Sequence, residues 1–332
     1  MPDLLPAKCR RASPRPLSAF LLGTAALLAV ACGPPAAPPR APTAEVEAER
    51  QRQYQQAAAH LLGHMERVSR VGARITVAGA PFCGEDTKPY IGILSASRSS
   101  VARKLGQHQA WKEAGAAMRE VWQIEGGPEV LAVLPDSPAS EVGIQVGDHI
   151  IDLKALTDTP GSPLWLEVSR HGKPIREKIP YVAECEYPVT ATVGDMVNAH
   201  VSGETIIITT GLLRFVERDD ELAVVIGHEL AHRILGHRRS RRRSRERAAD
   251  YIGVYLAARA GYDPAAAADF VRRLAAEHPE LISERASPAH PGTPGRVAAL
   301  DRAVAEIREK QRRGAPLFPE TIEGLDPEKD AR

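Results

Sequence analysis

The sequence predicts an α+β fold: a mostly helical domain with a short edge sheet, and before it a small β-rich domain. Helical periodicity dominates residues 190–312, whereas residues 75–189 hold short β-type runs separated by Gly, Pro and Asp. A hydrophobic fraction of 43% in 332 residues is enough for two packed domains. The net charge of +1 argues against nucleic acid as a partner of the whole chain.

The first 31 residues have the composition of a signal peptide. A positive segment comes first, and residues 17–31 then form an apolar run of mostly small residues. This run is too short to predict a membrane span. We therefore expect residues 1–31 to be a cleaved signal peptide. The positive residues are Lys8, Arg10, Arg11 and Arg15.

The signal-like segment ends in Leu28-Ala29-Val30-Ala31-Cys32. This pattern resembles the bacterial lipobox, which implies that Cys32 becomes the lipidated first residue of the mature protein. The next residue is Gly33, not the Asp that usually retains lipoproteins in the inner membrane. The resemblance thus implies an anchor in outer-membrane lipid, on the periplasmic side. The alternative is an ordinary signal peptide cut after Ala31.

Two cysteines remain once Cys9 and Cys32 are assigned to the signal and the lipid. They are Cys83 and Cys185, an even pair in an oxidising compartment. We expect a disulfide between them. The alternative is two unpaired buried thiols.

Three segments lie outside the two domains. Residues 32–43 are rich in Pro and Ala and predict an extended linker. Apolar residues three or four apart predict one amphipathic helix over residues 44–74. Residues 313–332 form a C-terminal tail.

The β-rich block predicts strands at residues 90–94, 130–134, 149–153, 164–169 and 175–181, and a helix at residues 99–121. Within it, Ser137 can cap a short helix that Pro138 opens, Gly143 can end that helix, and Gly147 can turn the chain into a strand. This order of residues resembles bacterial PDZ domains, so residues 75–189 are expected to form a PDZ-like domain. The alternative is a generic small β domain.

Residues 219–236 predict a helix that contains His228-Glu229-Leu230-Ala231-His232. Histidines at i and i+4 lie on one helical face, so both imidazoles can bind one tetrahedral metal ion. Glu229 lies beside them, where a carboxylate can take a proton from water. Two surface histidines on a helix are the alternative.

A zinc site of this kind needs a third protein ligand. A third histidine would stand where the sequence has Arg238, so that solution fails. Glu246 opens a second helical segment and can serve as the third ligand. Asp250, one turn later, can hydrogen-bond a ligating histidine and orient its ring.

Five motifs in order extend this pattern along residues 190–305. The chain here resembles the HtpX-like and CAAX-prenyl-protease type of zinc metallopeptidases. The resemblance implies a gluzincin-type fold, one Zn²⁺ per chain, and protein or peptide substrates. The motifs are His228 to His232, Glu246 with Asp250, Asn198 with the strand at residues 206–209, Gly261 to Pro264, and His290-Pro291 with Arg296 beyond.

The same resemblance implies roles for His290 and for the strand at residues 206–209. His290 is expected to stabilise the transition state or to lie at the fourth zinc position, with a structural role as the alternative. The strand at residues 206–209 is expected either to bind the substrate backbone by strand addition or to be an ordinary buried strand.

The sequence therefore predicts a zinc metalloendopeptidase of the bacterial cell envelope that hydrolyses misfolded or misassembled envelope proteins. The alternative is a scaffold or chaperone that binds peptides through the PDZ-like domain and has an idle or autoinhibited peptidase site. The arginine-rich run at residues 238–247 predicts a solvated loop or a contact with anionic lipid.

Overall fold

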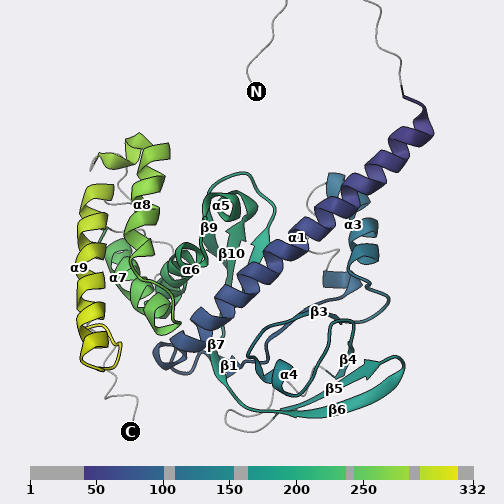
Figure 1. Ribbon diagram of the computed structural model, residues 1–332, viewed down its shortest axis with the longest axis horizontal. Coiled ribbons are helices and arrows are strands. Elements are labelled where there is room, and N and C mark those ends of the chain that lie inside the picture. Colours follow the sequence, from purple (N-terminus) through teal and green to yellow (C-terminus); the bar gives the residue numbers. More distant parts are fainter. Residues whose placement is uncertain (1–40, 101–108, 153–163, 237–242, 284–291, 321–332) are drawn as a thin grey trace, which may run out of the picture. The chain divides into compact units, whose positions relative to one another are not determined.

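A computed structural model describes residues 41–100, 109–152, 164–236, 243–283 and 292–320 (Figure 1). It confirms the α+β class, with about half of the described chain helical and several small sheets. The signal-like segment, Cys32 and most of the Pro-rich linker lie outside the described residues. No helix in the described ranges is long and apolar enough to cross a membrane.

The N-terminal helix α1 spans Thr43–Gly79, so it continues past the expected boundary at residue 74 (Figure 1). Its buried side chains recur at helical spacing and belong to the larger of two apolar cores. Two glycines let it approach its neighbours closely. A Cβ on Gly72 would lie 2.9 Å from the Cβ of Val189, and one on Gly79 would lie 3.1 Å from Leu230 Cδ2. The one-turn helix η1, Ala80–Phe82, follows.

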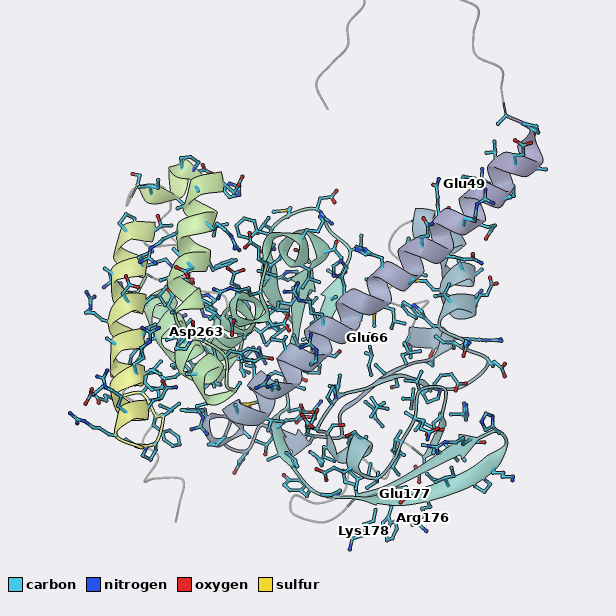
Figure 2. The ribbon with its side chains drawn as sticks, in the orientation of Figure 1. Glu49, Glu66, Arg176, Glu177, Lys178 and Asp263 are labelled. Carbon is cyan, nitrogen blue, oxygen red and sulfur yellow. A yellow bond between two sulfur atoms is a disulfide. The ribbon has the colours of Figure 1, made fainter. Side chains whose placement is uncertain are left out.

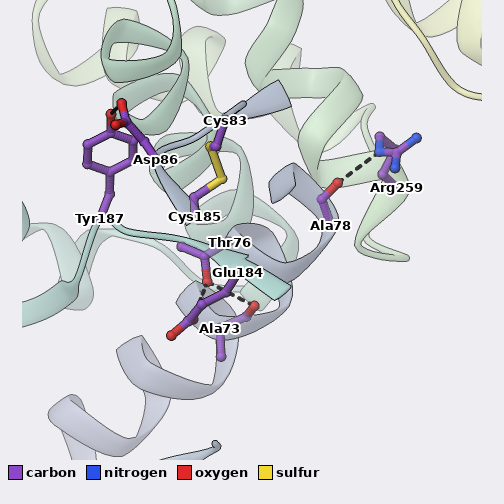
Figure 3. The surroundings of a disulfide bond; sticks show 9 residues. All are labelled: Ala73, Thr76, Ala78, Cys83, Asp86, Glu184, Cys185, Tyr187 and Arg259. Carbon is purple, nitrogen blue, oxygen red and sulfur yellow. Dashed lines mark hydrogen bonds between the residues drawn. A yellow bond between two sulfur atoms is a disulfide. The ribbon is translucent and has the colours of Figure 1, made fainter. Parts of the chain in front are cut away.

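The disulfide between Cys83 and Cys185 joins the end of η1 to strand β7, Ala183–Cys185 (Figure 3). Strand β7 pairs with β1, Thr87–Pro89, in a two-stranded antiparallel sheet. Cys185 is fully buried. The Thr76 hydroxyl on α1 donates to Glu184, so the helix and this small sheet are held together by a covalent bond and a hydrogen bond.

A five-stranded antiparallel sheet occupies most of the expected PDZ-like block, in the order β2-β3-β4-β5-β6. Ser137 caps α4, Pro138–Glu141, by accepting from the Ser140 N–H, and Gly143 and Gly147 adopt positive φ, as the sequence predicted. The edge strand β6 carries the charged residues Arg176, Glu177 and Lys178 (Figure 2), which protect an edge from pairing with other chains. The strands span Ile93–Ala96, Glu129–Val133, His149–Asp152, Leu164–Arg170 and Lys173–Ile179.

This sheet has its own apolar core, built from Val130, Ala139, Ile144, Leu166, Val168 and others. A PDZ fold is not identified by these features, which establish a small antiparallel sheet with one short helix. The helix expected at residues 99–121 is α3, Gln109–Val121, and residues 101–108 lie outside the described part. Trp122, just after α3, donates its indole N–H to the Ala58 carbonyl of α1.

A three-stranded sheet follows, in the order β8-β10-β9, and leads into α5, Thr210–Phe215. Strand β10, Thr205–Thr209, lies between the other two: it is parallel to β8, Val189–Thr192, and antiparallel to β9, Ala199–Ser202. Both sides of β10 are therefore occupied. The expectation that residues 206–209 bind a substrate backbone is wrong, and the alternative of a buried central strand is correct.

The remaining elements are helices. They are α6 at Asp219–Ile234, α7 at Arg243–Arg259, α8 at Ala266–Glu277, η3 at Pro279–Ile282 and α9 at Thr293–Arg312. Helix α9 packs against α7 and α8. The first part of the expected tail packs onto this core: the ring of Phe318 contacts that of Phe82, and the guanidinium of Arg259 lies over both rings.

Candidate metal centre

The two histidines of the motif lie on α6, whose position is set by contacts at its first turn. Asp219, Asp220 and Glu221 favour the helix N-terminus electrostatically. Asp219 also accepts hydrogen bonds from Arg67 and Arg70 of α1, at 2.8 Å each. The helix that carries the histidines is thus attached to α1 at its start.

Helix α7 crosses α6 at a pair of glycines. A Cβ on Gly227 would lie 2.6 Å from the Gly253 carbonyl oxygen, and a Cβ on Gly253 would lie 2.8 Å from the His228 backbone nitrogen. Real Cβ atoms essentially never come that close to backbone atoms. The two helices can therefore approach closely only because both positions lack a side chain, and this approach brings α7 carboxylates to the α6 histidines.

Three donor atoms converge between these helices. His228 Nε2 lies 3.1 Å from His232 Nε2 and 3.6 Å from Glu246 Oε2, and His232 Nε2 lies 3.7 Å from Glu246 Oε1. Ligands of a tetrahedral zinc at ordinary bond lengths lie about 3.3–3.5 Å from one another. The set of His228, His232 and Glu246 therefore fits a zinc-type site, and Glu246 is only 2% exposed.

The proton positions favour a metal as well. His228 Nδ1 lies 3.0 Å from Asp250 Oδ1, so a proton on Nδ1 is donated to that carboxylate. This tautomer leaves a lone pair on Nε2, the atom that faces His232 and Glu246. Burial alone would lower the pKa of His228, but hydrogen bonds to Asp250 and Glu246 raise it to about 9 when no metal is present. The two carboxylates thus favour positive charge at this position, whether a proton or a metal ion carries it.

Asp250 is held from the opposite side by Arg296 on α9. Arg296 Nε donates to Oδ2 at 2.9 Å and Nη2 donates to Oδ1 at 2.7 Å, a two-point contact between largely buried groups. Burial alone would raise the pKa of Asp250, but the Arg296 charge and the His228 hydrogen bond lower it well below its usual range. Asp250 therefore stays ionised and fixes the ring of His228.

Glu229 follows His228 on α6 and lies beside the three donors. Burial raises the pKa of its carboxyl group, while the charges of His228 and His232 lower it. His200 on strand β9 is close enough to act in the same direction. A carboxylate with a raised pKa is a stronger base than one in water.

Comparison with family models supports the same assignment. Residues 167–242 and 238–304 match the model described as Peptidase family M48. This part of the chain belongs to peptidase family M48. A comparison with curated proteins finds no match. The M48 segment includes all three donors, so the chain is a zinc metalloendopeptidase of this family.

The M48 match begins inside β5, earlier than the boundary expected at residue 190. His290 and the first half of the arginine-rich run, residues 238–242, lie outside the described residues, so their expected roles stay predictions. Three contributors to the site were not assigned a role from the sequence: the Gly227–Gly253 contact, Arg296, and His200. The i, i+3 and i+4 spacing on α6 and α7 contains no sign of these contacts, which join residues far apart in the chain.

Proposed function

We propose that this M48 peptidase is an endopeptidase of the bacterial cell envelope that uses one Zn²⁺ per chain to hydrolyse misfolded or misassembled proteins. The observation that carries the proposal is the convergence of His228, His232 and Glu246 with Glu229 beside them. A purely structural zinc site has four protein ligands, whereas three ligands and an adjacent carboxylate suit a catalytic site.

A bound zinc ion would supply Lewis acidity toward the scissile carbonyl group and the attacking water. The chain supplies the proton transfers: the Glu229 carboxylate accepts a proton from the water and passes it to the leaving amine. Asp250 keeps the His228 ring in one orientation throughout, because Arg296 holds the carboxylate in place.

The free edge of β9 supports a binding mode for the substrate backbone. Within the described residues, β9 pairs only with β10, and Ala199 of β9 lines a pocket together with His228 and Glu229. An extended peptide added to β9 would therefore pass directly by the donor atoms. This assigns to β9 the role first expected for residues 206–209.

The decisive test is Glu229→Gln. We expect this variant to keep its fold and its zinc but to lose peptide hydrolysis by at least about 100-fold, because only the proton acceptor is removed. Glu141→Gln, an exposed change of the same type, is the control and should cleave normally. Near-normal hydrolysis by Glu229→Gln would contradict the proposed role. The same variant, expressed in the envelope and purified, should retain uncleaved substrates for identification.

The envelope location rests on two sequence features and one structural feature. The signal-like segment and Cys32 favour a lipid anchor, and a disulfide is typical of an oxidising compartment. Metabolic labelling with a fatty-acid analogue should mark the wild-type chain and not Cys32→Ala. Labelling of both, or of neither, would remove the anchor from the proposal.

A second candidate function is a scaffold or chaperone that binds peptides on the five-stranded sheet. Strand β2 forms one edge of that sheet, and a pocket of about 390 Å³ beside it is lined by Tyr90 to Leu94 and by Thr76 of α1. These features are compatible with peptide binding by a PDZ-like domain. Full complementation of a deletion strain by Glu229→Gln would favour this second function over proteolysis.

A further inference from the structure

An apolar pocket lies directly beside the candidate metal centre. It has a volume of about 160 Å³, and His228 and Glu229 contribute to its wall. Most of the wall is aliphatic or aromatic: Leu212, Val224, Val225, Phe270, Val271 and Leu274. Whatever fills the pocket is therefore within reach of the residues that carry out the chemistry.

The pocket wall is preformed. Val271 is only 2% exposed and Val224 8%, so both are fixed by the surrounding core. Phe270 packs edge-on against Phe215 at 5.7 Å between ring centroids. Asp250 and Arg296 also line the pocket, but they are paired with each other and offer no uncompensated charge. The remaining acidic group in the wall is Glu229, so an acidic side chain placed there would lose its hydration and meet a like charge.

Exposed apolar side chains continue from the pocket into the loop between β8 and β9. Val197 lines the pocket and is 36% exposed, Met196 is 73% exposed and Val193 44%. We call the exposed side chains of Val193, Met196 and Val197 the apolar ridge.

The apolar ridge is held rigidly in place. The Thr209 hydroxyl donates to the Met196 carbonyl at 2.6 Å and accepts from the Asn198 N–H. The Gly211 N–H donates to the Gly194 carbonyl at 2.7 Å, and a Cβ on Gly211 would lie only 2.3 Å from the Met196 carbonyl oxygen. These contacts hold the backbone that carries the exposed apolar side chains, as is expected of a binding surface.

We infer that the pocket is the subsite for a large apolar side chain next to the scissile bond, and that the apolar ridge contacts apolar residues beyond it. This inference rests on the proposed function. A peptide added to β9 sends alternate side chains to one face, so a residue near the donor atoms can enter the pocket. The substrate class is then polypeptide with exposed apolar segments, which folded proteins bury and unfolded chains display.

Peptide cleavage tests the subsite. The zinc-loaded wild-type chain should cut a peptide library with Leu, Phe or Met enriched at one fixed position next to the cut. Replacing that residue by Gly or Asp should lower kcat/KM by about 10–200-fold, the range for one apolar contact or more. Leu274→Ala should shift the preference toward larger side chains. Leu62→Ala on α1, the same change in a partly buried residue away from the pocket, should not.

Binding of hydroxamates separates this inference from the proposed function. A small hydroxamate with a leucine-type side chain should bind the zinc-loaded chain at least about 10-fold more tightly than one without a side chain. Leu274→Ala should reduce that ratio. If the hydroxamates show this preference but no peptide is cut, the proposed function fails and the subsite stands. If peptides are cut, or hydroxamates bound, without apolar preference, the subsite is wrong.

The apolar ridge has its own test. Met196→Ser should raise KM for peptides with apolar residues several positions from the cut, while kcat changes little. Val146→Ser, a similarly exposed apolar residue in the turn before β4, is the control and should leave KM unchanged. If Met196→Ser instead reduces binding to anionic lipid vesicles and leaves peptide kinetics unchanged, the ridge contacts membrane and not substrate.

Discussion

The α6–α7 helix pair and the five-stranded sheet differ in where their buried polar groups lie. Between the helices, His228, Glu246 and Asp250 are largely buried and connected to one another, and Arg296 of α9 pairs with Asp250. The sheet has an aliphatic core, and its two buried carboxylates lie outside that core: Arg170 donates to Asp148, and Glu129 pairs with His149.

The difference shows that the metal centre, and not the sheet, contains a cluster of buried charged groups whose burial is unfavourable for folding. Burying this cluster of charged side chains is unfavourable by itself. The cluster is stable because each side chain has a hydrogen-bond or ionic partner, and because Gly227 and Gly253 let α6 and α7 approach closely. The sheet could be repacked with other apolar residues at modest cost. The following changes should therefore damage the helix pair more than the sheet.

The largest effect is expected from Gly253→Ala. The new methyl group would meet the His228 backbone nitrogen at 2.8 Å and its Cα at 3.0 Å, so α7 must move away from α6. A displacement of about 1 Å at a catalytic site costs on the order of 100-fold in rate. Zinc content and kcat/KM for one peptide measure the loss.

Gly63→Ala on α1 is the matched control for that change. No atom lies within 4 Å of the position that its new methyl group would take, so we expect normal zinc content and a gain in stability of about 0.5–1 kcal/mol. Full activity in Gly253→Ala would show that close helix approach does not determine the site.

Loss of the disulfide should be the next largest effect. Cys83 and Cys185 are 102 residues apart and enclose the whole five-stranded sheet. Loop-closure entropy predicts a destabilisation of up to about 4–5 kcal/mol in the double alanine variant. Urea unfolding with and without reductant measures it, and reductant should affect the wild type alone. An unchanged midpoint in the variant would contradict this estimate.

Arg296→Gln should weaken the metal centre itself. Removing the guanidinium leaves Asp250 buried and only partly paired, which costs about 3–5 kcal/mol of stability. Zinc affinity should fall about 10–100-fold, because Asp250 no longer fixes His228. Competition with a chelator measures affinity. Arg272→Gln breaks an exposed ion pair with Asp301 and should change stability by less than about 1 kcal/mol.

The smallest effect concerns the sheet. Burial alone would raise the pKa of Asp148, but hydrogen bonds from Arg170 and the Gln145 N–H hold that pKa below its ordinary value. A carboxyl group with a lowered pKa in the folded state adds stability above its unfolded pKa of about 3.9, and this is lost as the pH falls through the folded value. Asp148→Asn should lower stability by about 1–3 kcal/mol at pH 7 and much less near pH 2. A pH-independent difference would contradict the role of the charge.

Much of the candidate site could be predicted from local spacing. The period of an α-helix alone places His228 and His232 on one face and Glu229 beside them, and it places Asp250 one turn after Glu246. Capping and turn chemistry likewise predicted α4 and its flanking glycines, because Ser137, Gly143 and Gly147 act on their immediate neighbours.

Only the tertiary structure decided which strand has an unpaired edge near the metal centre and which residues surround that centre. Residues 206–209 have the composition of a strand, yet pairing with both β8 and β9 closes them to substrate, and strand order is not encoded within one strand. The partner of Asp250 stands 46 residues away on α9, and the apolar pocket combines α5, α6, α8 and the loop before β9. Local sequence determined the chemistry of the donors because neighbouring side chains share one helix. Long-range packing decided their surroundings because those contacts exist only once the helices and the sheet are assembled.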